Sequence, residues 1–160
     1  MATELIITTD DRVKFLRDCD IGEGLPESVL LRIANIASAL QLNAGDTLTE
    51  EGTDGHHLYI ITKGAIEVQL APNDLSGSAS SRMLPAGSII GEMSIIESNK
   101  RTARTIATER TTLLCIRDQD LWQLFDDDSH AGYLFMRNLA KVLSHRLRQT
   151  NLAIRHNFFA

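Results

Sequence analysis

A series of short segments with a two-residue hydrophobic period most constrains the fold of this chain, and it occupies about residues 40–117. Ile66, Val68 and Leu70 alternate with Glu67 and Gln69, which is the pattern of a strand with one buried face. Glycine-containing turns separate the segments at the spacing of a sandwich or barrel, which predicts roughly eight strands. The expected strands include residues 47–50, 57–62, 65–71, 82–84, 88–90, 105–108 and 111–116.

Both ends of the chain have helical periodicity instead. Asp11 is expected to cap a first helix, and Pro26 stands in the first turn of a second helix whose apolar stripe reaches Ala37. Asp118 is expected to cap a short helix, and Ser129 a long amphipathic one. Helices therefore flank the β region on both sides.

Length and composition suit one domain of this kind. The 160 residues are 43% hydrophobic and 23% charged, as in an ordinary globular domain with a core. The sequence predicts a mainly β fold with flanking α over residues 1–160. An eight-stranded, jelly-roll-like β-roll at about 40–117 follows N-terminal helices, and two C-terminal helices occupy about 118–155, the last long and amphipathic.

Charge and cysteine content narrow the function class. The net charge of -5 disfavours a nucleic-acid contact that depends on a basic surface. Cys19 and Cys115 lack CxxC spacing, which is typical of buried thiols in a reducing compartment. The N-terminus carries Glu4 where a signal peptide has basic residues, and no apolar stretch approaches membrane-spanning length. We therefore expect a cytoplasmic protein with no membrane segment.

The stretch GEMSIIESNKRTA, residues 91–103, has the groups of a phosphate pocket. Gly91 permits close approach to its backbone, and residues 93–96 can form a helical turn with free N–H groups. Arg101 can bind two phosphate oxygens at once, and Thr102 and Ala103 add a hydroxyl and an unobstructed N–H. Arg104 is expected to point outward, because the chain is a strand by that point.

Glu92 has the wrong charge for a phosphate pocket, so it should face a neutral donor beside the phosphate. A sugar hydroxyl is such a donor. A phosphate and a sugar hydroxyl close together indicate a nucleotide.

These residues resemble a known family. GEMSII followed by RTART is similar to the phosphate-binding cassette of cyclic nucleotide-binding domains, of the catabolite activator, protein kinase A regulatory subunit and cyclic nucleotide-gated channel type. The upstream segment GDTLTEEGTDGHHLYIITKGAIEV resembles the same family, and the likeness covers about residues 12–150. His56 and His57 stand at positions that are usually acidic or polar, and Arg104 at one that is usually small or apolar.

The resemblance implies a role for each matching residue. Glu92 would accept from the ribose 2′-hydroxyl and Arg101 would pair with the cyclic phosphate. The last helix would close over the base. The implied nucleotide-binding residues are Leu84, Gly91, Glu92, Met93, Ser94, Arg101, Thr102 and Ala103, and the implied lid residues are Leu139, Leu143 and Arg146.

The implied function is that of a regulatory sensor, with cyclic AMP as ligand and no cofactor or metal. Cyclic GMP is the alternative, because relatives with Thr at the Thr102 position include cyclic-GMP-preferring kinases. A homodimer through the last helix is expected. A larger protein or effector regulated in cis or in trans is a further possible partner, so the chain is either free-standing or part of a longer protein.

Other interpretations stay open from the residues alone. Glu92 and Arg101 could form a plain salt bridge in a nucleotide-free structural or dimerisation β-roll of the same fold. His56 and His57 raise the alternative of a cupin-like metal enzyme, although adjacent strand residues point to opposite faces. With neither a nucleophile–base pair nor a metal cluster in the sequence, we expect a binding module and not an enzyme.

Overall fold

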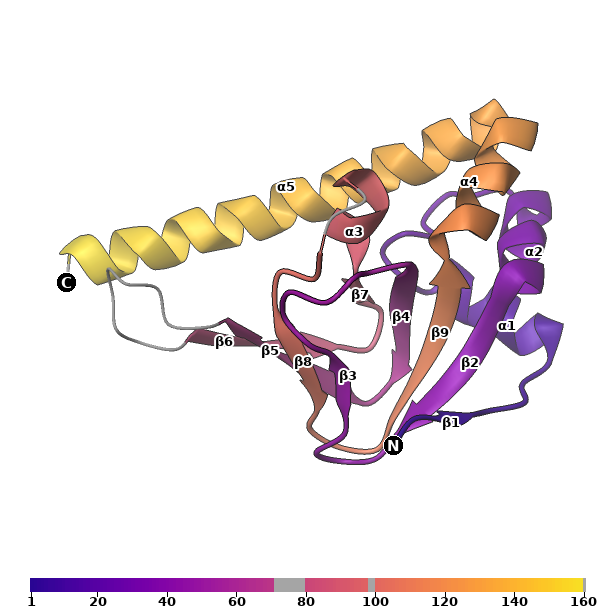
Figure 1. Ribbon diagram of the computed structural model, residues 1–160. Coiled ribbons are helices and arrows are strands. Elements are labelled where there is room, and N and C mark those ends of the chain that lie inside the picture. Colours follow the sequence, from indigo (N-terminus) through magenta and orange to yellow (C-terminus); the bar gives the residue numbers. More distant parts are fainter. Residues whose placement is uncertain (71–79, 98–99, 160) are drawn as a thin grey trace.

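The computed structural model describes residues 1–70, 80–97 and 100–159, with side chains to residue 155 (Figure 1). The strands of the β region lie between helices at both ends, as expected from the sequence, whereas the short N-terminal strand was not predicted. The elements are β1 (Thr3–Glu4), α1 (Thr9–Arg17), α2 (Glu27–Ile36), β2 (Ala37–Leu42), β3 (Thr47–Thr49), β4 (His57–Lys63), β5 (Ala65–Leu70), β6 (Ser80–Pro85), β7 (Ile89–Ile90), α3 (Glu92–Glu97), β8 (Arg104–Ala107), β9 (Thr111–Arg117), α4 (Asp118–Asp127) and α5 (Ser129–Phe159).

The strands form two antiparallel sheets that confirm the predicted β-roll. One sheet has the order β1-β2-β9-β4-β7 and the other β3-β8-β5-β6. The eight strands β2 to β9 make up the roll, and the short β1 adds to its edge by pairing Thr3 with Gln41. β4 and β5 are separated by Gly64 alone yet belong to different sheets, so this glycine marks a corner of the roll.

The central strands β4 and β9 of the first sheet are buried on both faces, which explains why they are continuously apolar. In β4, Leu58 and Ile60 pack with the helices, whereas Tyr59 and Ile61 face the second sheet inside the roll. β9 does the same with its run Leu113–Ile116. A strand covered on both sides loses the alternation of a half-exposed strand.

Two details of the N-terminal region differ from the sequence predictions. The cap of α1 is Thr8, whose Oγ1 accepts from the Asp11 N–H (3.1 Å), and not Asp11. Ala37 does not continue the stripe of α2, because it opens β2 and pairs with Ile116. Its N–H still donates to the Ile33 carbonyl oxygen, so Ala37 is the C-cap of α2, but its backbone is already extended (φ -85°, ψ 138°). Pairing in the sheet thus overrides local helical periodicity.

The two C-terminal helices are also capped differently. α4 begins at Asp118 without a side-chain capping bond. Asp128 caps α5, because its Oδ1 accepts from the Ala131 N–H (3.0 Å), whereas Ser129 is already the first helical residue. The predicted helices are therefore present, each shifted by about one residue at its start.

Helix α5 has two parts with different surroundings. Its first part is packed in the core through Leu134, Phe135 and Leu139, and Asn138 Nδ2 donates to the carbonyl oxygens of Ile21 (2.9 Å) and Glu23 (2.8 Å). From residue 144 its described side chains are exposed, apart from that of Arg146. In Figure 1 this second part passes over α3 toward the end of β6. α5 therefore connects the helical core to the open end of the roll.

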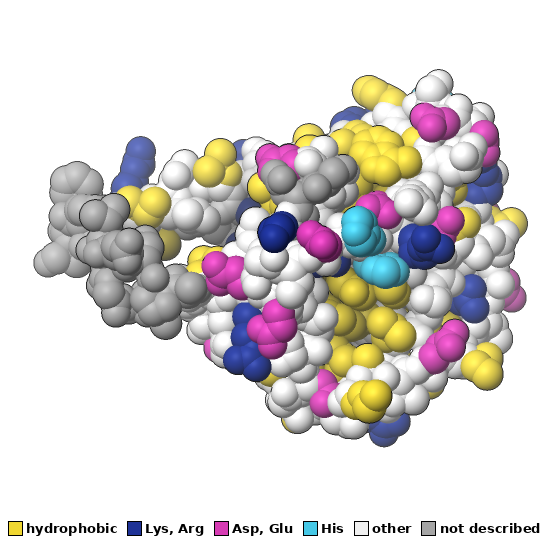
Figure 2. Space-filling view, in the orientation of Figure 1, with side chains coloured by type: hydrophobic (Ala, Val, Ile, Leu, Met, Phe, Trp, Pro, Cys, Tyr) yellow, Lys and Arg dark blue, Asp and Glu magenta, His cyan; other side chains and the backbone are white. Residues whose placement is uncertain are grey.

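The surface carries both charge signs. Figure 2 shows acidic and basic side chains interspersed over one face of the molecule. In the described ranges, none of the helices has both the length and the hydrophobicity that a membrane span requires.

Candidate functional site

A cavity of about 590 Å³ lies between the roll and the second part of α5. Strands β5, β6 and β8 and helices α3 and α5 contribute its walls. The structure brings together in this cavity all of the residues that the sequence singled out for nucleotide contact: Leu84, Gly91, Glu92, Met93, Ser94, Arg101, Thr102 and Ala103.

The three predicted lid residues have different positions. Arg146 lines the cavity. Leu139 is only 1% exposed and lies in the helical core, and Leu143 packs at the edge of that core. In this structure, only Arg146 of the three is placed to contact a molecule in the cavity.

Arg101 places a buried positive charge at the cavity wall. The residue is 8% exposed, its Nη2 donates to the His57 carbonyl oxygen (2.9 Å), and its Cζ lies 5.5 Å from the centre of the Tyr59 ring. Nη1 reaches the Ser94 Oγ at 3.5 Å. Within the described ranges, no carboxylate lies at ion-pair distance from this guanidinium. A buried charge without a counter-ion is costly, so this position favours an anion from outside the chain.

The surroundings of Arg101 change the titration of its neighbours. Burial, with the charges of Arg101 and Arg117, lowers the pKa of His57. Burial raises the pKa of Tyr59. Both effects keep these side chains neutral near pH 7, so Arg101 remains the dominant charge at this end of the cavity.

Two glycines leave room for the Arg101 guanidinium. Gly91 has a φ of 90°, and a Cβ there would lie 2.2 Å from Arg101 Nη1. A Cβ on Gly55 would lie 2.5 Å from Ser94 Oγ and 2.7 Å from Arg101 Nε. The sequence indicated Gly91 as a site residue but not Gly55, whose position against Arg101 depends on long-range packing.

Glu92 is paired, but not with Arg101. Its Oε1 accepts from Arg146 Nη1 at 2.5 Å, and Arg146 Nη2 donates to the Ile89 carbonyl oxygen at 2.6 Å. The side chains of Glu92 and Arg146 are 11% and 16% exposed. Glu92 therefore forms a salt bridge with Arg146 of α5, and not with Arg101, which was one of the alternatives from the sequence.

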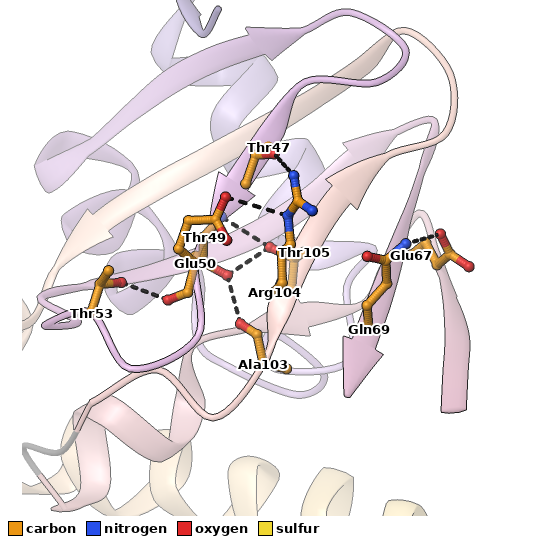
Figure 3. A network of polar contacts seen from close by, with 9 residues as sticks. All are labelled: Thr47, Thr49, Glu50, Thr53, Glu67, Gln69, Ala103, Arg104 and Thr105. Atoms are coloured by element: carbon orange, nitrogen blue, oxygen red, sulfur yellow. Dashed lines mark hydrogen bonds and ion pairs between the residues drawn. The ribbon is translucent and has the colours of Figure 1, made fainter. Parts of the chain in front are cut away.

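Two threonines form part of the cavity wall beside residues 101–103. Thr49 Oγ1 lies 2.7 Å from Thr105 Oγ1 and 3.3 Å from the Ala103 carbonyl oxygen (Figure 3). Both threonines are buried and both line the cavity. Sequence reasoning missed Thr49, because the register between β3 and β8 that brings it to Thr105 is not readable from local pattern.

Arg104 lies on the outer surface, as the alternation of β8 predicted. Its Nε is 3.3 Å from Glu50 Oε1 and its Nη2 donates to Thr47 Oγ1 at 3.2 Å (Figure 3). Arg104 is exposed and does not line the cavity, whereas Arg101 does. The two basic residues thus have separate surroundings.

Another part of the cavity lining is built from residues that the sequence did not indicate as site residues. They combine apolar surface with hydroxyl, amide and guanidinium groups, which can enclose a flat polar ring. Burial and the nearby charge of Arg146 lower the pKa of Arg82, against the opposing effect of Glu92. These lining residues are Val68, Leu70, Ser80, Ser81, Arg82, Gln149, Thr150 and Ala153.

The histidine pair has other contacts. His56 Nδ1 lies 3.2 Å from Asp118 Oδ2, and the His57 ring stacks beside that of Tyr59. Among the residues that the structure describes, no three His, Cys, Asp or Glu side chains gather in a metal-binding arrangement.

Two relatives are similar over much of this sequence. The chain is 30% identical over 130 residues to the cyclic AMP receptor protein of Thermus thermophilus, which covers 81% of this chain and 57% of that protein. It is 28% identical over 102 residues to a cGMP-dependent protein kinase of Drosophila melanogaster (isozyme 2 forms cD5/T2), covering 64% of this chain and 11% of the kinase. The chain thus spans only part of each relative.

The fold is shared with solved structures. A cyclic nucleotide-binding domain from Methylobacillus flagellatus superimposes with a TM-score of 0.83, at 20% identity, over 96% of this chain and 87% of that one. The family model for the cyclic nucleotide-binding domain matches residues 39–128, more than half of the sequence. The chain therefore belongs to the cyclic nucleotide-binding domain family, a family of ligand-binding and not catalytic domains.

Proposed function

We propose that this chain is a regulatory sensor that binds a cyclic nucleotide in the cavity between the roll and α5, and is not an enzyme. The observation that carries the proposal is the buried Arg101 guanidinium, which reaches the cavity with no carboxylate partner among the described residues. A cyclic phosphate carries a single negative charge and presents two exocyclic oxygens. A guanidinium binds such a pair of oxygens by two parallel hydrogen bonds.

Other residues that line the cavity suit the remaining parts of the ligand. With the phosphate at Arg101, the ribose 2′-hydroxyl lies toward Glu92, whose Oε2 has the capacity to accept it. The base then lies among Val68, Leu84 and the side chains of α5. Apolar walls with a few convergent polar groups are typical of small-ligand sites.

Cyclic AMP is the ligand we propose, with cyclic GMP as the second candidate. The relatives named above include one whose name specifies cyclic AMP and one whose name specifies cyclic GMP. The cyclic GMP alternative depends on Thr102, which lines the cavity and is exposed. A hydroxyl there can donate to or accept from either base.

The proposed output is a shift in the position of α5. A nucleotide that contacts both the roll and α5 binds the closed arrangement better and increases its population. The exposed side chains of Leu147, Leu152 and Ile154 are available for a second copy or for a regulated protein in cis or in trans. Closure of α5 would thus change a binding surface.

The two cysteines suit the cytoplasm, where we propose that the protein acts. Cys19 and Cys115 are buried in different core clusters, and burial raises the pKa of each to about 11. Neutral buried thiols require no disulfide partner.

Calorimetric titration with cyclic AMP and cyclic GMP tests the proposal directly, and Arg101→Ala with Arg104→Ala supplies matched variants. Losing one partner of a buried charge pair costs about 2–5 kcal/mol, so Arg101→Ala should weaken binding by about thirtyfold to a few thousandfold. Arg104→Ala, at an exposed site, should change affinity by less than about threefold.

Both variants must retain the wild-type far-ultraviolet circular dichroism spectrum before the affinities are compared. Absence of binding to either nucleotide by the wild-type protein would reject the function. A larger loss in Arg104→Ala than in Arg101→Ala would reject the assignment of the phosphate to Arg101.

A further inference from the structure

Arg146 joins α5 to the segment that runs from β7 into α3 through two contacts. One nitrogen donates to Glu92 Oε1 (2.5 Å) and the other to the Ile89 carbonyl oxygen (2.6 Å). The guanidinium is rigid and planar, so two contacts fix its orientation as well as its position. Arg146 therefore holds one oxygen of the Glu92 carboxylate from a defined direction.

The pair has an electrostatic consequence for the cavity. Both side chains are more than four-fifths buried, and a buried carboxylate without a partner would be costly and would repel an incoming phosphate. Arg146 offsets that charge without occupying the second oxygen of Glu92. A carboxylate has about four acceptor positions, and no described residue donates to Oε2, so this oxygen is left for a neutral donor.

The pair also lies at a particular place along α5. The part of the helix before residue 143 is fastened by Leu139 and by the two hydrogen bonds of Asn138. Among the described residues beyond it, Arg146 hydrogen-bonds to Glu92 and Ile89, whereas its neighbours Ser144, His145 and Leu147 are exposed. The position of the second part of α5 and the orientation of Glu92 are thereby set by the same side chain.

We infer that Arg146 is a positioning residue for the Glu92 carboxylate, which it orients from the lid helix to receive the ribose 2′-hydroxyl. The inference rests on the proposed function and adds to it a coupling between ribose recognition and the position of α5. Recognition of the ribose and closure of α5 are two results of one ion pair. Arg146 acts on the nucleotide through Glu92.

The experiment compares cyclic AMP with 2′-deoxy cyclic AMP in the full chain, by titration calorimetry. The variants are Arg146→Gln, Glu92→Gln and the double variant. Arg148→Gln is the control, because it removes a positive charge from an exposed position two residues further along the same helix. Thermal unfolding followed by circular dichroism establishes that each variant is folded.

Arg146→Gln is expected to weaken cyclic AMP binding by about tenfold to a hundredfold, the range for a hydrogen bond to a charged group. It should weaken 2′-deoxy cyclic AMP binding less, so that preference for the ribonucleotide falls by about tenfold. In the Glu92→Gln background, Arg146→Gln should change both affinities equally. Arg148→Gln should leave the preference unchanged.

Three results would overturn the inference. One is an equal loss for both nucleotides in Arg146→Gln, which would indicate a purely structural or electrostatic role. Another is a ribose-specific loss that persists without Glu92. The third is tighter cyclic AMP binding, which would make Arg146 a competitor for Glu92. A wild-type protein that binds neither nucleotide would reject the proposed function itself, whereas these three results leave it standing.

Discussion

Gly91 shows how the backbone of one residue determines the shape of the site. Its φ of 90° lies in a region that other residues rarely adopt, and it turns the chain from β7 into α3. A Cβ at this position would lie 2.2 Å from Arg101 Nη1 and 2.6 Å from the His57 carbonyl oxygen. The same glycine therefore permits the turn and leaves space for the Arg101 guanidinium.

We predict that Gly91→Ala loses nucleotide affinity by at least about tenfold, because the new methyl group displaces Arg101. Gly45→Ala is the matched control, since Gly45 has a φ of 87° but no atom within 4 Å of the added Cβ. Backbone strain should lower the free energy of unfolding by about 1–2 kcal/mol in both variants. Urea unfolding and calorimetry measure the two effects separately. Unchanged affinity in Gly91→Ala would show that Arg101 tolerates the displacement.

At the residue scale, the sequence indicates functional groups better than it indicates their partners. The spacing of Gly91, Glu92 and Arg101 was sufficient to place all three at one cavity. The partner of Glu92 was not predictable, because Arg146 is 54 residues away and reaches it only through the course of α5. The N-cap of α5 was predicted one residue too late, again because the sequence does not show which partner a side chain finds. Asp128 and Ser129 are both good capping residues, and backbone geometry selects between them.

Among the secondary-structure elements, α5 connects stability with the site. Its first part contributes Leu134, Phe135 and Leu139 to the helical core, and its second part supplies Arg146 and Gln149 to the cavity. Helical periodicity is continuous across the boundary, so the sequence alone does not separate the two parts. Their burial does.

We predict that ending the chain after Ser144 leaves the roll folded but weakens nucleotide binding, because Arg146, Gln149 and Thr150 are lost from the cavity. Ending it after Asn151 is the control, which keeps these three residues and removes the exposed Leu152 and Ile154. Circular dichroism melting and calorimetry test both chains. Equal affinity of the shorter chain and the full chain would mean that α5 is not a lid.

Strand prediction succeeded where one face of a strand was exposed or a turn was explicit. The strands β4 and β9 were predicted at residues 57–62 and 111–116, although both faces of each are buried. The start of β2 was missed, because Ala37 fits the stripe of the preceding helix equally well. The sequence could not assign strands to sheets, since Gly64 joins two strands that do not pair.

The whole molecule has an uneven charge distribution along its sequence. Residues 129–160 contain five Lys and Arg and no Asp or Glu, so this region has a charge of +5. Residues 1–128 contain eleven basic and 21 acidic residues, a charge of -10. A homodimer through α5 therefore pairs two helices of the same sign, and the apolar surface must outweigh their repulsion.

We predict from this that a dimer formed through α5 becomes tighter as salt is added. Raising the ionic strength from about 0.01 M to about 1 M shortens the Debye length from about 30 Å to about 3 Å and screens the repulsion. Leu147→Asn should abolish the association, because Leu147 is 62% exposed and shares one helix face with Leu143 and Ile154. Sedimentation equilibrium at several salt concentrations measures both effects. A dimer that weakens with salt would contradict the helix-to-helix arrangement and indicate instead that the basic α5 of one copy contacts the acidic body of the other.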